Sequence, residues 1–224
     1  ESMSKQGWEV GFQKKEWLGN IKKHAHAKTS SFWAWEENNM IILDAEKVAE
    51  QIESAKTLIA EYRKENKTIL LVCEKFIVLD DVEEIVKQTG INYFYTGTPS
   101  GILTNFDTLH NTIKSMNKLE QFVASEDFAT LTKKEQLMKK RNLTKIQKIY
   151  KGVKELRKKP DLVILVEGKM LAKFVDEVEK TKAKSIVIAN ADFDRYFDDQ
   201  NLIITNTKSK QALSFVMKYI FGLA

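Results

Sequence analysis

The sequence predicts an α/β fold in which a parallel sheet is covered by helices on both faces and a two-helix hairpin is inserted into the domain. Short apolar runs alternate along the chain with segments of helical periodicity, and several runs are continuous stretches of Val, Ile and Leu. Continuous runs are typical of parallel strands buried on both faces, and the alternation indicates βαβ units. A third observation predicts the hairpin, because residues 103–151 contain no strand-like run.

Six apolar runs are predicted to be strands of this fold. They occupy residues 40–43, 69–73, 92–95, 162–166, 185–189 and 202–204. Residues 45–65 carry apolar side chains at three- and four-residue steps, which predicts an amphipathic helix. The segments 80–88, 170–180 and 209–221 have a similar pattern. We expect these helices to connect the strands and to cover the sheet.

Residues 103–151 are predicted to form two long helices that pair as an antiparallel coiled-coil hairpin. The apolar positions of the first helix are Leu103, Phe106, Leu109, Ile113, Met116, Leu119 and Phe122. Those of the second are Leu137, Met138, Leu143, Ile146, Ile149 and Tyr150. We expect both stripes to form the core between the helices. Thr132 and Glu135 fit a capping box at the start of the second helix, and the short connection 124–130 lets the helices pair.

The pattern predicts a single α/β domain over residues 38–224, with the hairpin as an insertion at 103–151 and an irregular N-terminal arm over residues 1–37. The arm holds all four tryptophans, Trp8, Trp17, Trp33 and Trp35, among several lysines. Interleaved aromatic and basic side chains can stack on bases and contact phosphates. The same tryptophans could instead anchor the arm to the sheet, and the sequence leaves both interpretations open.

The charge of the chain is concentrated in one stretch. Residues 132–159 contain twelve basic and two acidic residues, a net charge of +10, so the remainder of this +5 chain stands at −5. A local excess of this size favours a polyanion-binding surface over an ordinary solvated helix face. The predicted RNA-binding residues are Lys133, Lys134, Lys139, Lys140, Arg141, Lys145, Lys148, Lys151, Lys154, Arg157, Lys158 and Lys159. They cannot all face one way on a helix, so we expect about half to contact phosphate.

The signatures of several other protein classes are weak or missing. No apolar run approaches the roughly 20 residues of a membrane span. The lone cysteine, Cys73, lies in an apolar run and is predicted to be buried, which is compatible with a reducing compartment. The pair His24 and His26 lacks a nearby cluster of further metal ligands, and the acidic residues Asp192, Asp194, Asp198 and Asp199 are interpreted as loop charges. We expect no membrane contact and no metal site.

A nucleotide site on this fold would require a glycine-rich turn after a strand. The chain after residues 69–73 has no such glycine, and the pair Gly168 and Lys169 after residues 162–166 lacks the rest of a phosphate-binding loop. We therefore expect no cofactor, no small-molecule substrate and no enzymatic activity. Two alternatives stay open: a nucleotide-dependent enzyme on this fold, and a coiled-coil adaptor that acts through protein partners alone.

Several motifs, in register, resemble the bacterial and organellar branch of the ribosomal protein S-two family. The segment 131–135 reads Leu-Thr-Lys-Lys-Glu, as in the second hairpin helix of that family, and is followed by Met138 and Arg141. Leu103, Thr104 and Asn105 match the family's Leu-Thr-Asn, where we interpret Thr104 and Asn105 as a helix cap. The segments 152–154, 160–166 and 201–204 occupy the places of later family motifs. In order and spacing, the resemblance extends from about residue 38 to residue 220.

This resemblance implies a Rossmann-like domain with a projecting helical hairpin and a structural role in the small ribosomal subunit. The implied partners are small-subunit ribosomal RNA and neighbouring ribosomal proteins. The sequence departs from the family at residues 24–35, 97–101 and 190–194, so RNA contacts made there by family members are not carried over. This divergence, with frequent Lys, Ile and Asn, suggests an AT-rich genome and a ribosome in the mitochondrial matrix; the cytoplasm of a reduced bacterium is the alternative.

Overall fold

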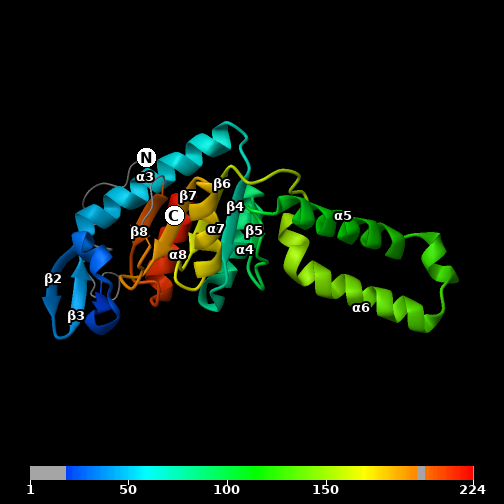
Figure 1. Ribbon diagram of the computed structural model, residues 1–224, viewed down its shortest axis with the longest axis horizontal. Coiled ribbons are helices and arrows are strands. Elements are labelled where there is room, and N and C mark those ends of the chain that lie inside the picture. The colour runs from blue at the N-terminus through cyan, green and yellow to red at the C-terminus, as the bar shows by residue number, and fades with distance from the viewer. Residues whose placement is uncertain (1–18, 196–199, 224) are drawn as a thin grey trace.

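The centre of the molecule is a five-stranded parallel sheet with the strand order β5-β4-β6-β7-β8 (Figure 1). A computed structural model describes residues 19–195 and 200–223. The strands are β4 (Ile69–Cys73), β5 (Asn92–Phe94), β6 (Leu162–Val166), β7 (Ser185–Ala189) and β8 (Gln200–Ile204). Every residue of β4, β6 and β7 is buried, as expected for parallel strands covered on both faces. The predicted α/β fold with a parallel sheet is confirmed.

Helices cover both faces of this sheet. They are α3 (Ala45–Lys64), α4 (Leu79–Thr89), α7 (Ala172–Thr181) and α8 (Lys210–Ile220). Helix α8 contacts both α3 and α4, which places these three helices on one face. Helix α4 leads from β4 to β5, whereas α7 leads from β6 to β7 in the opposite direction along the sheet. Because such crossovers are right-handed, α7 lies on the other face.

A second, smaller sheet corrects the prediction for residues 40–43. These residues form β3 (Met40–Leu43), which pairs antiparallel with β1 (Gly19–Ile21) and β2 (Trp33–Glu37) and takes no part in the parallel sheet. The physical reason is a tight turn between β2 and β3, in which Asn38 and Asn39 both have positive φ. Two such residues favour a hairpin connection, so β3 folds back on the strand before it.

The described part of the predicted N-terminal arm is not irregular. Besides β1 and β2 it contains two short 3-10 helices, η1 (Lys22–His24) and η2 (Ala27–Phe32). Trp33 donates a hydrogen bond from Nε1 to Oγ1 of Thr29 at 3.0 Å and packs against the core, which fits an anchoring role. Trp35 is 55% exposed, while Trp8 and Trp17 lie outside the described residues. The division into an arm and one domain stays a prediction.

The predicted two-helix hairpin is inserted between β5 and β6. It consists of α5 (Phe106–Val123), the 3-10 turn η4 (Glu126–Thr130) and α6 (Lys133–Tyr150), followed by η5 (Lys151–Val153), which contacts β5. The two helices run antiparallel and project outward beside β5, at the edge of the sheet (Figure 1). Coiled-coil packing between them stays a prediction. Within the described ranges, no helix has the length and apolar character that a membrane crossing requires.

Candidate nucleic-acid interface

Helix α6, which carries much of the basic stretch, begins at a capping box. The Thr132 hydroxyl accepts a hydrogen bond from the Glu135 amide at 3.4 Å, and the Thr132 amide donates to the Glu135 carboxylate at 3.0 Å. The hydrogen bond from the Thr132 hydroxyl, and then that from the Thr132 amide, lower the pKa of Glu135 below its ordinary value. The predicted cap is confirmed, and it sets Lys133 as the first residue of α6.

One face of α6 packs against α5. Leu143 is buried on this face, and Gln147 donates a hydrogen bond to Glu120 of α5 at 3.2 Å. The Lys139 ammonium lies 5.2 Å from the ring centre of Phe122. Cations over aromatic faces are held by the ring quadrupole, so Lys139 is partly engaged within the hairpin.

The opposite face of α6 presents cations to solvent. Lys134, Arg141, Lys145 and Lys148 recur at steps of seven, four and three residues, which places them on one side of an α-helix. With about 100° of rotation per residue, this side lies roughly opposite Leu143. All four side chains belong to exposed residues, and no ion pair or ring contact joins them to the described part of the chain. We call these four residues the outer basic face; it extends over about 21 Å at 1.5 Å per residue.

The other basic residues of the stretch divide into engaged and unengaged ones. Lys154 pairs with Glu120 at 2.5 Å, Lys158 with Asp161 at 2.9 Å and Arg157 with Glu155 at 3.8 Å. Lys140 lies 5.5 Å from the ring centre of Phe128. Lys133, Lys151 and Lys159 are exposed and have no such partner among the described residues. The structure therefore separates the twelve predicted residues into groups that the sequence pattern could not distinguish.

The predicted apolar stripe of α6 is wrong at its beginning. Leu137 and Met138 are 49% and 61% exposed, whereas Leu143 is buried and Ile146 is half-buried. Helical geometry explains the difference, because positions 137 and 138 lie about 120° and 140° from position 143 around the axis. Both side chains consequently lie beside the outer basic face, where they add an apolar element to it.

The base of the hairpin is held by two carboxylates that the sequence did not reveal. Glu177 of α7 is buried and accepts hydrogen bonds from the amides of Gly101 and Leu103, the latter at 3.0 Å. Glu74, after β4, accepts one from the amide of Thr98 at 2.8 Å. Both glutamates occupy ordinary positions in the sequence, so no local signal could have identified them. They fix the direction in which α5 leaves the domain.

The predicted helix cap at Thr104 and Asn105 is only half correct. Asn105 occupies the N-cap position of α5, but its side chain makes no capping hydrogen bond. Its amide instead donates to the carbonyl of Gly101 at 2.8 Å. The start of α5 is therefore organised by the preceding turn and by Glu177.

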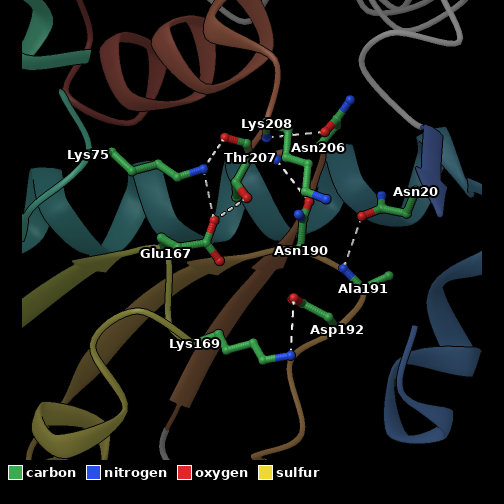
Figure 2. Close-up of polar contacts among 10 residues, drawn as sticks. All are labelled: Asn20, Lys75, Glu167, Lys169, Asn190, Ala191, Asp192, Asn206, Thr207 and Lys208. Atoms are coloured by element: carbon green, nitrogen blue, oxygen red, sulfur yellow. Dashed lines mark hydrogen bonds and ion pairs between the residues drawn. The ribbon is translucent and has the colours of Figure 1, made fainter. Parts of the chain in front are cut away.

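The carboxyl ends of the parallel strands, where a doubly wound domain usually binds its ligand, are linked by the chain's own side chains (Figure 2). Lys75, after β4, pairs with Glu167, after β6, at 3.0 Å and donates to the carbonyl of Thr207 at 2.5 Å. The Thr207 hydroxyl donates to Glu167, and its amide donates to Asn190 at 3.0 Å. The strand order reverses between β4 and β6, and a nucleotide would bind at this point. The polar groups that it would contact there bond to one another instead.

The lone Gly-Lys pair after β6 has a packing explanation. A side chain at Gly168 would lie 2.5 Å from the ring of Phe193 and 2.7 Å from Val187, both of which are buried. Lys169 pairs with Asp192 at 3.4 Å, so neither residue needs a phosphate to account for it. Asp198 and Asp199 lie outside the described residues. Within the described ranges, no three His, Cys, Asp or Glu side chains gather as metal ligands would, and His26 caps η2 by accepting from the Lys28 amide.

Two features define this chain: an α/β domain in which side chains bridge the carboxyl ends of the parallel strands, and a projecting hairpin whose second helix exposes one row of cations. A family model described as Ribosomal protein S2 matches residues 12–222, and the chain belongs to this family. The family is structural and non-enzymatic, which confirms that the chain is not an enzyme. Membership also supports a structural role in the small ribosomal subunit.

Similar proteins are found among bacteria under the name small ribosomal subunit protein uS2. The protein of Dictyoglomus thermophilum is 30% identical over 188 residues, which cover 84% of this chain and 73% of the relative. That of Coprothermobacter proteolyticus is 30% identical over 78% of this chain and 62% of the relative. That of Thermus thermophilus is 28% identical over 84% of this chain and 70% of the relative. The bacterial-type resemblance seen in the sequence is thereby confirmed.

Proposed function

We propose that this chain is a structural constituent of the small ribosomal subunit that binds small-subunit ribosomal RNA through the outer basic face of α6. The observation that carries the proposal is the presence of four cations on one side of a projecting helix, each without an ionic partner among the described residues. Unpaired cations at this spacing repel one another until phosphates neutralise them, and each neutralised phosphate releases counterions that favour binding.

Leu137 and Met138 extend this interface. They lie beside the cations and are exposed, so an RNA surface that covers the outer basic face also covers apolar side chains. Lys133, Lys151 and Lys159 lie near the ends of the basic stretch and are proposed as further phosphate contacts. Lys139, Lys140, Lys154, Arg157 and Lys158 are proposed as secondary contacts, because each is already engaged within the chain. Neighbouring ribosomal proteins are the second class of partner.

Sedimentation of a native lysate tests the proposal. The wild-type chain is expected to peak with the small subunit in magnesium, and its peak should shift when chelation loosens the subunit. A variant with Lys134, Arg141, Lys145 and Lys148 all changed to Gln should move toward the top of the gradient. The matched control changes four engaged lysines, Lys139, Lys140, Lys154 and Lys158, to Gln and removes the same charge.

The control should stay largely with the subunit, because its lysines interact mainly within the hairpin and with the adjacent domain. Equal loss from both variants would show that bulk charge, and not the outer basic face, governs assembly. A wild-type chain found only at the top of both gradients would overturn the ribosomal proposal and favour an adaptor that acts through protein partners.

We propose the mitochondrial matrix as the compartment of this ribosome. The support is the divergence of the sequence at residues 97–101 and 190–194 from the family pattern. The relatives compared above are bacterial, so a bacterial cytoplasm is the competing location. Protection of the chain from added protease in isolated mitochondria, lost when the inner membrane is opened, is the expected result. A gene located on a bacterial chromosome would refute the mitochondrial assignment.

A further inference from the structure

An exposed apolar turn precedes α4 on the side of the sheet that also holds α3 and α8. The 3-10 turn η3 (Phe76–Val78) follows β4, and Phe76 is 82% exposed. Ile77 beside it is also exposed. Single exposed apolar residues are common on protein surfaces, so exposure alone does not define a site. The turn is set apart by its rigidity and by the charges around it.

The turn is fixed at both ends. Lys75, immediately before it, is held by Glu167 at 3.0 Å and by the carbonyl of Thr207 (Figure 2). Val78, two residues after Phe76, is fully buried in the core. A large side chain on a backbone fixed in this way loses little freedom when it is bound, which favours its use as an anchor in an interface.

Carboxylates continue this surface along α4. Asp80 and Glu83 are exposed, and no ion pair joins either of them to a described residue. Asp80 and Glu83 are three positions apart on α4 and therefore lie on one side of that helix. Phe76 and Ile77 lie in the 3-10 turn that leads directly into α4. Glu84 is occupied by Lys218 of α8 at 2.8 Å, and Lys87 in the last turn marks the end of the acidic surface.

We propose that Phe76, Ile77, Asp80 and Glu83 form a docking surface for a basic protein segment that carries an apolar pocket or side chain. Charge complementarity decides the partner, because carboxylates beside an apolar anchor repel the phosphates of RNA and attract Lys and Arg. The chain outside residues 132–159 has a net charge of −5, so this surface belongs to the part of the chain in which acidic residues outnumber basic ones. The surface is separate from the outer basic face and does not depend on RNA binding there.

Photo-crosslinking from two matched positions tests the proposal. Phe76 is replaced by p-benzoylphenylalanine in the full chain, and Met170 is replaced in the same way as the control. Met170 is 52% exposed in the loop after β6, but its neighbours Lys169 and Lys173 are basic. Both variants are irradiated in native lysate, fractions are collected by sedimentation, and crosslinked peptides are sequenced by mass spectrometry. Thermal melting of each variant checks that the fold is retained.

The expected result is a crosslink from position 76 to a protein segment of net positive charge, with a markedly lower yield from position 170. The paired changes Asp80→Asn and Glu83→Gln should lower the yield roughly five-fold, since both carboxylates then lose their charge. Crosslinking to RNA, to an acidic segment, or with equal yield from both positions would overturn the proposal, as would the absence of any crosslink. Co-sedimentation of the same samples reports separately on the proposed ribosomal function.

Discussion

The salt dependence of RNA binding offers a quantitative test of the outer basic face. Each phosphate neutralised contributes a slope of about −0.7 for single strands to −0.9 for a B-form duplex in a plot of log affinity against log salt. If Lys134, Arg141, Lys145 and Lys148 each contact one phosphate, together they contribute a slope of about −3. Changing all four to Gln should make the measured slope shallower by that amount.

The size of the effect follows from the same relation. A slope contribution of about −3 corresponds to roughly a 60-fold loss of affinity between 50 and 200 mM salt. The wild-type chain should therefore lose most of its affinity across this range, and the variant should lose far less. Fluorescence anisotropy with labelled small-subunit rRNA fragments, titrated at several KCl concentrations, measures both slopes.

The control for this experiment is the set of engaged lysines. Changing Lys139, Lys140, Lys154 and Lys158 to Gln removes the same charge but should change the slope by less than about one, because these side chains already have partners within the chain. A slope that changes equally in both variants, or in neither, would refute the assignment of phosphate contacts to the outer basic face.

Three further predictions concern stability and reactivity. A Cβ at Gly152 would lie 2.3 Å from the backbone oxygen of Tyr93. Gly152→Ala should therefore lower the free energy of unfolding by about 3 kcal/mol and the melting temperature by about 6–12 °C. The control variant Gly90→Ala, whose Cβ meets nothing within 4 Å, should lower the free energy of unfolding by only about 1 kcal/mol. Burial raises the pKa of Cys73 to about 11, so a thiol reagent at pH 8 should label it only after denaturation. The folded pKa of Glu135 is lowered, so its stabilising contribution should be present above its unfolded pKa and should disappear as the pH falls through its folded pKa. A Thr132→Ala variant should lack this part of the acid transition.

The fold was largely predictable because apolar periodicity reports burial directly. Strands β4, β6 and β7 are continuous apolar runs with every residue buried, and the capping box at Thr132 marks the start of α6. The prediction was wrong for residues 40–43, where strand propensity was correct but pairing was not. Partner choice there depends on the turn at Asn38 and Asn39, and two positive φ values are not apparent from an Asn-Asn pair alone.

The candidate site was predictable in composition and not in geometry. The basic stretch was visible as a count of charges, but which cations are free depends on residues far away in the sequence. Lys154, for instance, is engaged by Glu120 of α5, and Lys139 by the ring of Phe122. Glu177 and Thr207 were missed for the same reason, because each acts through contacts with segments that are distant along the chain.

The insertion of the hairpin between β5 and β6 has a consequence for how the domain folds. Thr68 and Asp161, which bond across the start of β4 and β6, are 93 positions apart in the chain, and closing so long a segment is slow when it is disordered. The hairpin contains mostly local contacts, so it can form first and bring its own two ends together. The pairing of β4 with β6 then requires closure of a much shorter effective loop, and helix α6 of a newly made chain is complete before the sheet is. We expect hydrogen exchange during refolding to protect α5 and α6 ahead of β6.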